Sequence, residues 1–138
     1  MSQGFVLDAC SLIAFLNDEE GAGKVEELQR QGERQPGSLF LHEINLLEIY
    51  YGIYRDEGEV LAEQVYEQVL GLPVEIVRGV GEPVFRAAGR LKATYGVSLA
   101  DSIALAEAKI RGIPLATFDH HEFEELEQSG ELGFFWIR

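Results

Sequence analysis

The feature that most constrains this chain is the alternation of short apolar runs with longer stretches of helical periodicity. The runs at 5–7, 38–41, 74–77, 115–118 and 134–137 are short enough to be buried strands. Helices are expected between them, at 12–16, 24–31, 44–55, 60–70, 83–95, 99–111 and 122–128, with Gly32 and the Pro36-Gly37 pair ending the second. This alternation predicts an α/β fold, a mostly parallel sheet of about five strands with helices on both faces.

Length and composition place the chain among ordinary globular proteins. Its 138 residues, 46% hydrophobic and 25% charged, suit one domain spanning 1–138, and no repeat or linker-like segment divides it. A single cysteine excludes an internal disulfide framework and fits a reducing cytoplasm, so a cytoplasmic location is expected. No apolar run approaches the roughly 18 residues that span a bilayer, so no membrane segment is expected.

The charge of the chain is strongly acidic but unevenly spread. A net charge of −13, taken alone, argues against a nucleic-acid-binding protein, which usually carries a basic face. Residues 1–77 hold 15 acidic and 4 basic side chains, whereas residues 78–117 carry a net charge of +3. An acidic protein therefore contains one mildly basic stretch.

Four carboxylates fall where an α/β sheet places its functional groups, at the carboxyl ends of strands. Asp8 follows the first predicted strand and Asp119 the fourth, while Glu48 and Asp101 lie near the starts of helices. Carboxylates gathered at one edge repel one another unless cations neutralise them or some are protonated. All-oxygen sites of this kind suit Mg²⁺ or Mn²⁺, which activate water for phosphoryl hydrolysis.

Each carboxylate also has a structural explanation. Asp101 completes a Ser-x-x-Asp pattern with Ser98, which is typical of a helix capping box. Asp8 and Asp119 are common turn formers. Glu48 is harder to explain in this way, because apolar residues surround it in the sequence and a buried carboxylate rarely lacks a role. The four acids together, rather than any one of them, favour a metal site.

Other constellations carry less weight. Cys10 opens a helix after a strand, as an activated thiolate would, but no arginine and glycine cradle follows it, and a small buried residue is expected. The His120-His121 pair matches no zinc-ligand spacing and is interpreted as a polar helix start. The aromatic run 134–136 is interpreted as a closing core strand. The chain contains no dinucleotide-binding or P-loop glycine motif.

At these residues the sequence resembles the PIN-domain family, and more closely the VapC-like toxins of bacterial and archaeal toxin–antitoxin pairs. The resemblance covers nearly the whole chain. It is carried by residues 6–14 (VLDACSLIA), by 47–52, which contain Leu47-Glu48 and Tyr51-Gly52, and by 98–106 (SLADSIALA), continuing through 112–119 (GIPLATFD) to Glu122-Phe123. The third motif, with its spacing from Asp101 to Asp119, is the most specific.

The resemblance implies a PIN-like fold and a Mg²⁺- or Mn²⁺-dependent endoribonuclease that cleaves RNA by a metal-activated water, with one or two ions. Asp8, Glu48, Asp101 and Asp119 match the positions of the family's catalytic, metal-binding acids. The resemblance also implies that this chain is the toxin, that it forms a homodimer, and that a small antitoxin protein is its partner.

The groups beside these acids match the family less completely. The family commonly has a hydroxyl or amide one or two places after the first Asp, where this chain has Ala9 and Cys10, with Ser11 one step further on. Thr117 stands where the family often has Thr or Ser near the last acid. Ser11 and Thr117 are therefore the hydroxyl groups expected to support the acids.

Contacts to RNA are predicted in the basic stretch. The candidates to follow the RNA backbone are Arg86, Arg90, Lys92, Lys109 and Arg111. The structural alternative for each is an ordinary solvated helix residue.

Two further functions stay compatible with the sequence. One is a PIN-like binding module without catalysis, which regulates through its antitoxin and DNA. The other, less favoured, is a phosphatase or another Mg²⁺ hydrolase on an α/β sheet. The complete set of four acids favours the ribonuclease, because a module without catalysis has no need of such a repulsive cluster.

Overall fold

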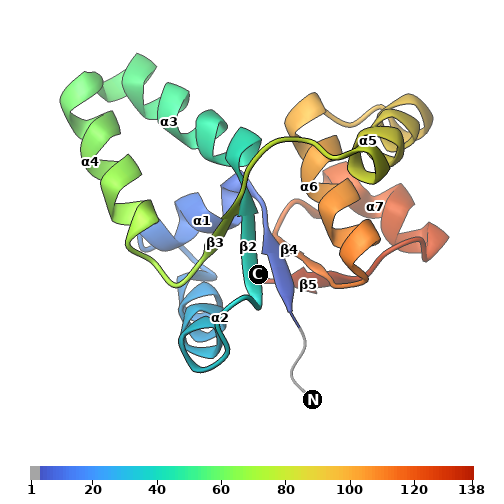
Figure 1. The fold of residues 1–138 in the computed structure, drawn as a ribbon, viewed down its shortest axis with the longest axis horizontal. Coiled ribbons are helices and arrows are strands. Elements are labelled where there is room, and N and C mark those ends of the chain that lie inside the picture. The colour runs from blue at the N-terminus through green and yellow to red at the C-terminus, as the bar shows by residue number, and fades with distance from the viewer. Residues whose placement is uncertain (1–3) are drawn as a thin grey trace.

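The computed structural model describes residues 4–138. A five-stranded sheet is combined with helices that alternate with its strands along the chain (Figure 1). The elements in order are β1 (Phe5–Leu7), α1 (Ala9–Leu16), α2 (Ala22–Arg34), β2 (Leu39–His42), α3 (Glu43–Glu57), α4 (Glu59–Leu70), β3 (Glu75–Val77), α5 (Glu82–Tyr95), α6 (Leu99–Arg111), β4 (Leu115–Thr117), α7 (His120–Ser129) and β5 (Phe134–Trp136).

The sheet has the order β3-β2-β1-β4-β5, and each of its neighbouring strands pairs in parallel. The first strand in the chain is therefore the central one, with Val6 opposite Phe40 of β2 and Leu7 opposite Ala116 of β4. Parallel pairing requires each strand to be followed by a crossover, which the helices supply. The predicted α/β fold with a parallel five-stranded sheet is confirmed.

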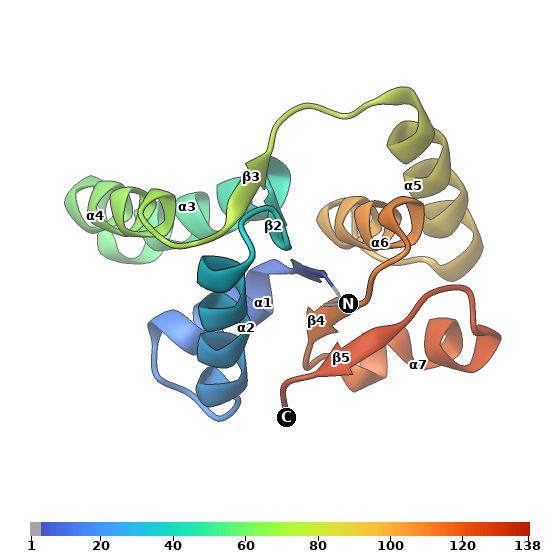
Figure 2. The same ribbon diagram turned by 60° about the horizontal axis from the view of Figure 1, so that its bottom comes forward.

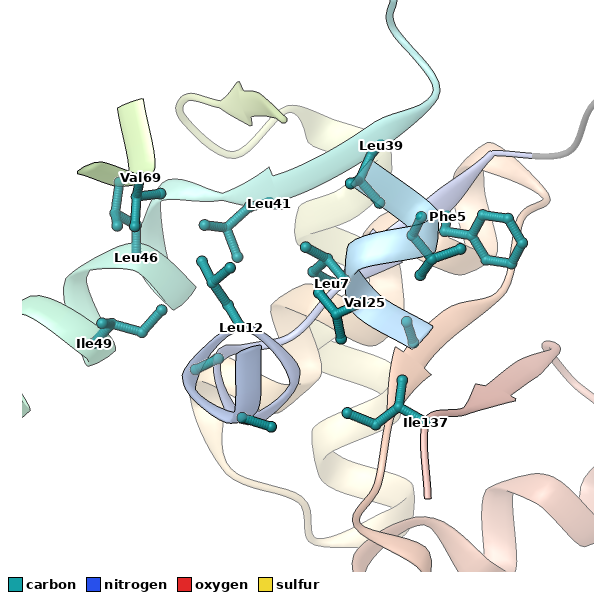
Figure 3. Close-up of a cluster of buried hydrophobic side chains, with 14 residues drawn as sticks. Phe5, Leu7, Leu12, Val25, Leu39, Leu41, Leu46, Ile49, Val69 and Ile137 are labelled. Carbon is teal, nitrogen blue, oxygen red and sulfur yellow. The ribbon is translucent and has the colours of Figure 1, made fainter. Parts of the chain in front are cut away.

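Two apolar cores lie on opposite faces of the sheet, because successive strand residues point to opposite faces. On one face Leu7, Leu39 and Leu41 pack with residues of α1 and α2, as Figure 3 shows for Leu12 and Val25. On the other face Val6, Phe40 and Leu115 pack against α5, α6 and α7. Helices thus cover both faces, as the near-continuous apolar strands require.

The helices form two groups, one on each side of the sheet. In Figures 1 and 2, α1, α2, α3 and α4 lie to one side, and α5, α6 and α7 lie together on the other. Three strands lead almost directly into a helix at the carboxyl end of the sheet, and side chains of Asp8, His42 and Asp119 cap the starts of α1, α3 and α7. Side-chain caps satisfy backbone N–H groups that the first helical turn leaves unpaired.

Several predicted boundaries differ from the observed ones. The first helix begins at Ala9 rather than at residue 12, because the Asp8 carboxylate caps it, and β4 ends at Thr117, one residue early. The prediction that Gly32 ends the second helix is wrong, since α2 continues to Arg34. A Cβ at Gly32 would lie 2.6 Å from the carbonyl oxygen of Pro73, so the glycine is needed for close packing inside the helix.

No helix within residues 4–138 is both long enough and apolar enough to span a bilayer.

The two kinds of helical glycine predict opposite effects of the same substitution. Gly32→Ala should lower the free energy of unfolding by about 1–3 kcal/mol, because the new methyl group meets the Pro73 carbonyl. Gly89→Ala, inside α5 with nothing within 4 Å of its Cβ position, should raise it by about 0.5–1 kcal/mol. Urea unfolding of both variants checks this, and a stabilising Gly32→Ala would contradict the packing argument.

Candidate functional site

Asp8 is the most deeply buried of the four predicted acids. It lies directly after the central strand with 2% of its surface exposed. Its Oδ1 accepts hydrogen bonds from the backbone N–H of Ser11, at 2.9 Å, and from the thiol of Cys10, at 3.1 Å. Burial raises the pKa of Asp8, and the hydrogen bonds from Thr117, Ser11 and Cys10 partly offset this. The carboxyl group is therefore held in one orientation in a poorly solvated place.

Asp101 lies in the first turn of α6. Ser98 caps this helix, and its Oγ accepts a hydrogen bond from the backbone N–H of Asp101 at 3.1 Å, so the predicted capping pattern is confirmed. Burial raises the pKa of Asp101 to about 7, although its hydrogen bond with Ser98 acts in the opposite direction. The nearby charges of Asp8, Glu122 and Glu48 raise the pKa further. A structural cap and a perturbed carboxylate thus coexist in one residue.

Glu48 completes a group of three acids whose pKa values are raised. It is half-buried on α3, and its pKa is raised first by burial and then by the charge of Asp8. Asp8, Glu48 and Asp101 come from three separate segments of the chain. The structure therefore places them in one electrostatic neighbourhood at the carboxyl end of the sheet.

Asp119 is used differently from the other three acids. Its Oδ1 caps α7 by accepting a hydrogen bond from the N–H of Glu122 at 3.1 Å. Its own N–H donates to the hydroxyl of Thr117 at 3.3 Å. Glu122, one turn into α7, adds its charge to those acting on Asp101. Helix capping occupies Asp119, while Glu122 extends the acidic neighbourhood.

Ser11 and Thr117 are both fully buried beside Asp8, as expected for supporting hydroxyl groups. The Ser11 hydroxyl donates to the carbonyl of Ala116 at 2.6 Å and so ties α1 to β4. Thr117 contacts the sulfur of Cys10 at 3.5 Å and is among the groups that lower the pKa of Asp8.

Cys10 is half-buried rather than the small buried residue expected from the sequence. Burial, followed by the charge of Asp8, raises the pKa of its thiol to about 12. The thiol is therefore protonated at neutral pH and donates to Asp8. It supplies a hydrogen-bond donor close to the position where the related family carries a hydroxyl or amide.

The donor set suits a hard divalent cation. Asp8, Glu48 and Asp101 offer only carboxylate oxygens and take part in none of the ion pairs among residues 4–138. As the side chains stand, no three His, Cys, Asp or Glu residues in this part of the chain converge closely enough to hold an ion. Mg²⁺ commonly uses only one or two protein carboxylates, with waters and substrate phosphates completing its coordination. Repulsion also keeps unneutralised carboxylates apart, and a cation would remove it.

Two polar residues at this place were not among the residues predicted for the site. Glu122 could have been found because it stands three positions after Asp119, as the N3 acid of a capped helix. Asn45 stands three positions before Glu48, hence on the same face of α3, and it is fully buried. The spacing is visible in the sequence, but the burial of Asn45 is not.

The five basic residues predicted to follow RNA all have partners within the chain. Glu131 receives both Arg90 and Lys109, and its pKa is lowered to about 2, first by Arg90 and then by Tyr95. The other pairings are Arg86 with Glu82, Lys92 with the carbonyl of Val97, and Arg111 with Glu107. Carboxylates partly neutralise the charges of the four residues other than Lys92, and contact with RNA stays a prediction.

The two histidines that follow Asp119 lie at the start of α7, which confirms a polar helix start. His120 stacks on Trp136 with ring centroids 3.8 Å apart, and its Nε2 lies 2.9 Å from the carbonyl oxygen of Arg138. The aromatic run forms β5, also as expected.

Comparison with protein families identifies one match. The model of the PIN domain family matches residues 5–128, a range that contains all four predicted acids. The comparison with curated proteins gave no match.

Solved structures with the same fold cover almost the whole chain. DNA-bound VapBC from Salmonella typhimurium contains a chain of 17% identity and TM-score 0.75, with 99% of this chain and 100% of that chain covered. A chain in a toxin–antitoxin complex from Klebsiella pneumoniae has 18% sequence identity and a TM-score of 0.68, with 98% of both chains covered. A chain of FitAcB from Neisseria gonorrhoeae has 20% sequence identity and a TM-score of 0.67, with 95% of this chain and 96% of that chain covered. These likenesses establish the fold and confirm the resemblance noted in the sequence.

The raised pKa of Asp101 predicts how pH affects the metal-free protein. Because the pKa of this carboxyl is higher in the folded than in the unfolded chain, the free energy of unfolding falls as pH rises from about 4 to about 7. Asp101→Asn removes this penalty. At pH 7.5 in EDTA the variant should therefore be more stable than the wild type by about 1–2 kcal/mol. This is less than the full pKa shift would give, because Asp101 keeps some contact with solvent, which screens its charge.

Thermal unfolding across pH 4–8 in EDTA measures this difference. The advantage of Asp101→Asn should be absent near pH 4 and should grow up to about pH 7. A variant that is less stable than the wild type at pH 7.5 would show that Asp101 is not destabilised by its surroundings.

Proposed function

Because this chain belongs to the PIN domain family, we propose that it is a Mg²⁺- or Mn²⁺-dependent endoribonuclease acting as the toxin of a toxin–antitoxin pair. The observation that carries this proposal is the group of three buried or half-buried acids, Asp8, Glu48 and Asp101, whose pKa values are all raised, chiefly by burial, and which have no basic partner among residues 4–138. Such a costly arrangement is explained if the acids bind cations.

The acids have distinct tasks in this proposal. Asp8, fixed by Ser11 and Cys10, is the rigid ligand, whereas Glu48 and Asp101 approach it from neighbouring helices. Asp119, which caps α7 in the structure, completes the predicted set. A bound divalent cation would supply Lewis-acid chemistry, neutralising phosphate charge and lowering the pKa of water.

The protein's contribution to catalysis is orientation and proton control. With a pKa of about 7 in the metal-free state, Asp101 carries a proton on its carboxyl group for part of the time at neutral pH and gives it up when the site becomes more positive. With a cation held by these acids, the scissile phosphate would be oriented for in-line attack by water, leaving a 5′-phosphate and a 3′-hydroxyl.

A groove beside Glu48 is the proposed docking place of the antitoxin. It has a volume of about 640 Å³ and is lined by residues of α1, α3 and α4. Its apolar surface comes from Ile13, Leu16, Ile49, Ile53, Leu61 and Val65. Three acids, Glu48, Asp56 and Glu57, line it against one base, Arg55, which pairs with Asp56, so the groove is negative overall. This combination suits an amphipathic basic segment that ends near the acids. Homodimer formation is a further prediction from the family resemblance, and a single domain over residues 1–138 is a further prediction from length and composition.

RNA cleavage tests the activity directly. The purified chain should cleave labelled tRNA or mRNA with Mg²⁺ or Mn²⁺ and stop when EDTA is added. Asp101→Asn should lower the cleavage rate by roughly 10²-fold or more, because loss of a metal ligand removes several kcal/mol of transition-state stabilisation. Glu124→Gln, which removes an exposed acid of α7, is the matched control and should retain full activity.

Three results would contradict the proposal. Full activity of Asp101→Asn would show that this acid does not have its assigned role. Cleavage that persists in EDTA would show that the activity does not depend on a metal ion. Tight binding of an antitoxin without any RNA cleavage would instead favour the non-catalytic module.

The docking groove makes a separate prediction. Leu61 is 40% exposed and lines the groove from α4, a helix that carries none of the four predicted acids. Leu61→Arg, which adds bulk and positive charge, should weaken capture of the antitoxin encoded by the neighbouring reading frame by at least about tenfold. RNA cleavage by the free variant should match that of the wild type. Unchanged capture would place the antitoxin elsewhere.

A further inference from the structure

We propose that Asn45 is a positioning residue, which fixes the helix carrying Glu48 against the first turn of the helix carrying Asp101. The inference rests on the proposed metal-dependent function, since Glu48 and Asp101 are assigned there as ligands. It concerns a residue that neither approaches the ion nor belongs to the four acids.

The position of Asn45 links the two acid-bearing helices. Its side chain is fully buried, and its Nδ2 donates a hydrogen bond to the carbonyl oxygen of Ala100 at 3.2 Å. Asn45 lies about one turn before Glu48 on α3, and Ala100 directly precedes Asp101 on α6. One hydrogen bond therefore joins segments 55 residues apart in sequence, next to an acid on each side.

The other side-chain atom of Asn45 makes the residue costly. Its Oδ1 is buried without a hydrogen-bond partner, and Gln29 Nε2 is the other such atom found within residues 4–138. An unpaired buried polar atom destabilises a fold, and an apolar side chain of similar volume would fill the space without this penalty. Packing alone therefore does not account for an asparagine here.

A second buried residue holds the start of α3 at a different point. His42 Nδ1 accepts from the N–H of Ile44 at 3.0 Å, so the ring proton is on Nε2, which donates to the carbonyl of Gly79 at 2.7 Å. The same Nε2 lies 3.7 Å from a carboxylate oxygen of Glu107, well along α6 from Ala100.

The two contacts together fix the angle between α3 and α6. His42 approaches α6 at Glu107, and Asn45 approaches it at Ala100, so α3 is held at two separated places. Without the Asn45 bond, α3 is free to pivot about its capped start. Glu48 would then shift relative to Asp101, and small displacements of metal ligands have large effects on affinity and rate.

The substitution Asn45→Leu separates positioning from stability. It keeps the branching and the number of side-chain heavy atoms, removes the unpaired oxygen and leaves the Ala100 carbonyl within its own helix. We expect an unchanged or higher Tm, together with a Kd for Mn²⁺ that is roughly 10–100-fold weaker, measured from the electron paramagnetic resonance signal of free Mn²⁺. The kcat for RNA cleavage should fall in parallel with little change in KM at saturating Mn²⁺.

Gln29→Leu is the matched control, because it also removes a buried unpaired amide atom, on α2. Its Tm should likewise be unchanged or higher, but its Mn²⁺ affinity and cleavage should equal those of the wild type. Asn45→Ala, which introduces no new atoms, should show the same loss of Mn²⁺ affinity when measured below its Tm. The alanine variant keeps the test valid if a leucine does not fit at position 45.

The possible outcomes distinguish the two proposals. If the wild type binds Mn²⁺ and cleaves RNA but both Asn45 variants do so equally well, only the positioning role is overturned. If Gln29→Leu loses as much Mn²⁺ affinity as Asn45→Leu, the effect is general and the positioning role is again overturned. If the wild type binds no Mn²⁺, the metal-dependent function fails and the positioning role fails with it.

Discussion

Burial of Asp8 at the carboxyl end of the central strand is the constraint on which the site depends. The same carboxylate caps α1 and contacts Ser11 and Cys10, so its position is fixed by the fold. Its charge is in turn one of the causes that raise the pKa of Glu48 and of Asp101. Their own burial, together with this charge, thus perturbs two helix residues, and a cation is the simplest way to relieve the cost.

Much of the fold could be predicted because each strand is a short apolar run between helical patterns. Strand order could not, since the placement of β1 between β2 and β4 depends on crossovers and packing. Gly32 shows the limit of local rules: a glycine inside a helical pattern predicts an end, but the nearby carbonyl of Pro73 gives it a packing role that only the tertiary structure contains.

The site was predictable where a carboxylate follows a strand or opens a helix, as for Asp8 and Asp101. The role of a site residue was less predictable where it depends on the direction of the side chain. Asp119 has the expected place in the chain, yet its carboxylate caps α7. Asn45 offered only a helical spacing, because its bond to Ala100 spans 55 residues. The net charge of −13 was also a poor guide, since pairing within the chain, as between Arg90 and Glu131, determines which charges remain available.

Anomalous diffraction from crystals soaked in Mn²⁺ at pH 8 would test the central claim most directly. The account predicts a peak within about 2.2 Å of carboxylate oxygens of Asp8 and at least one of Glu48 and Asp101, with waters in the remaining positions. Crystals in which these three carboxylates contact only protein and water, with no anomalous peak among them at saturating Mn²⁺, would contradict it.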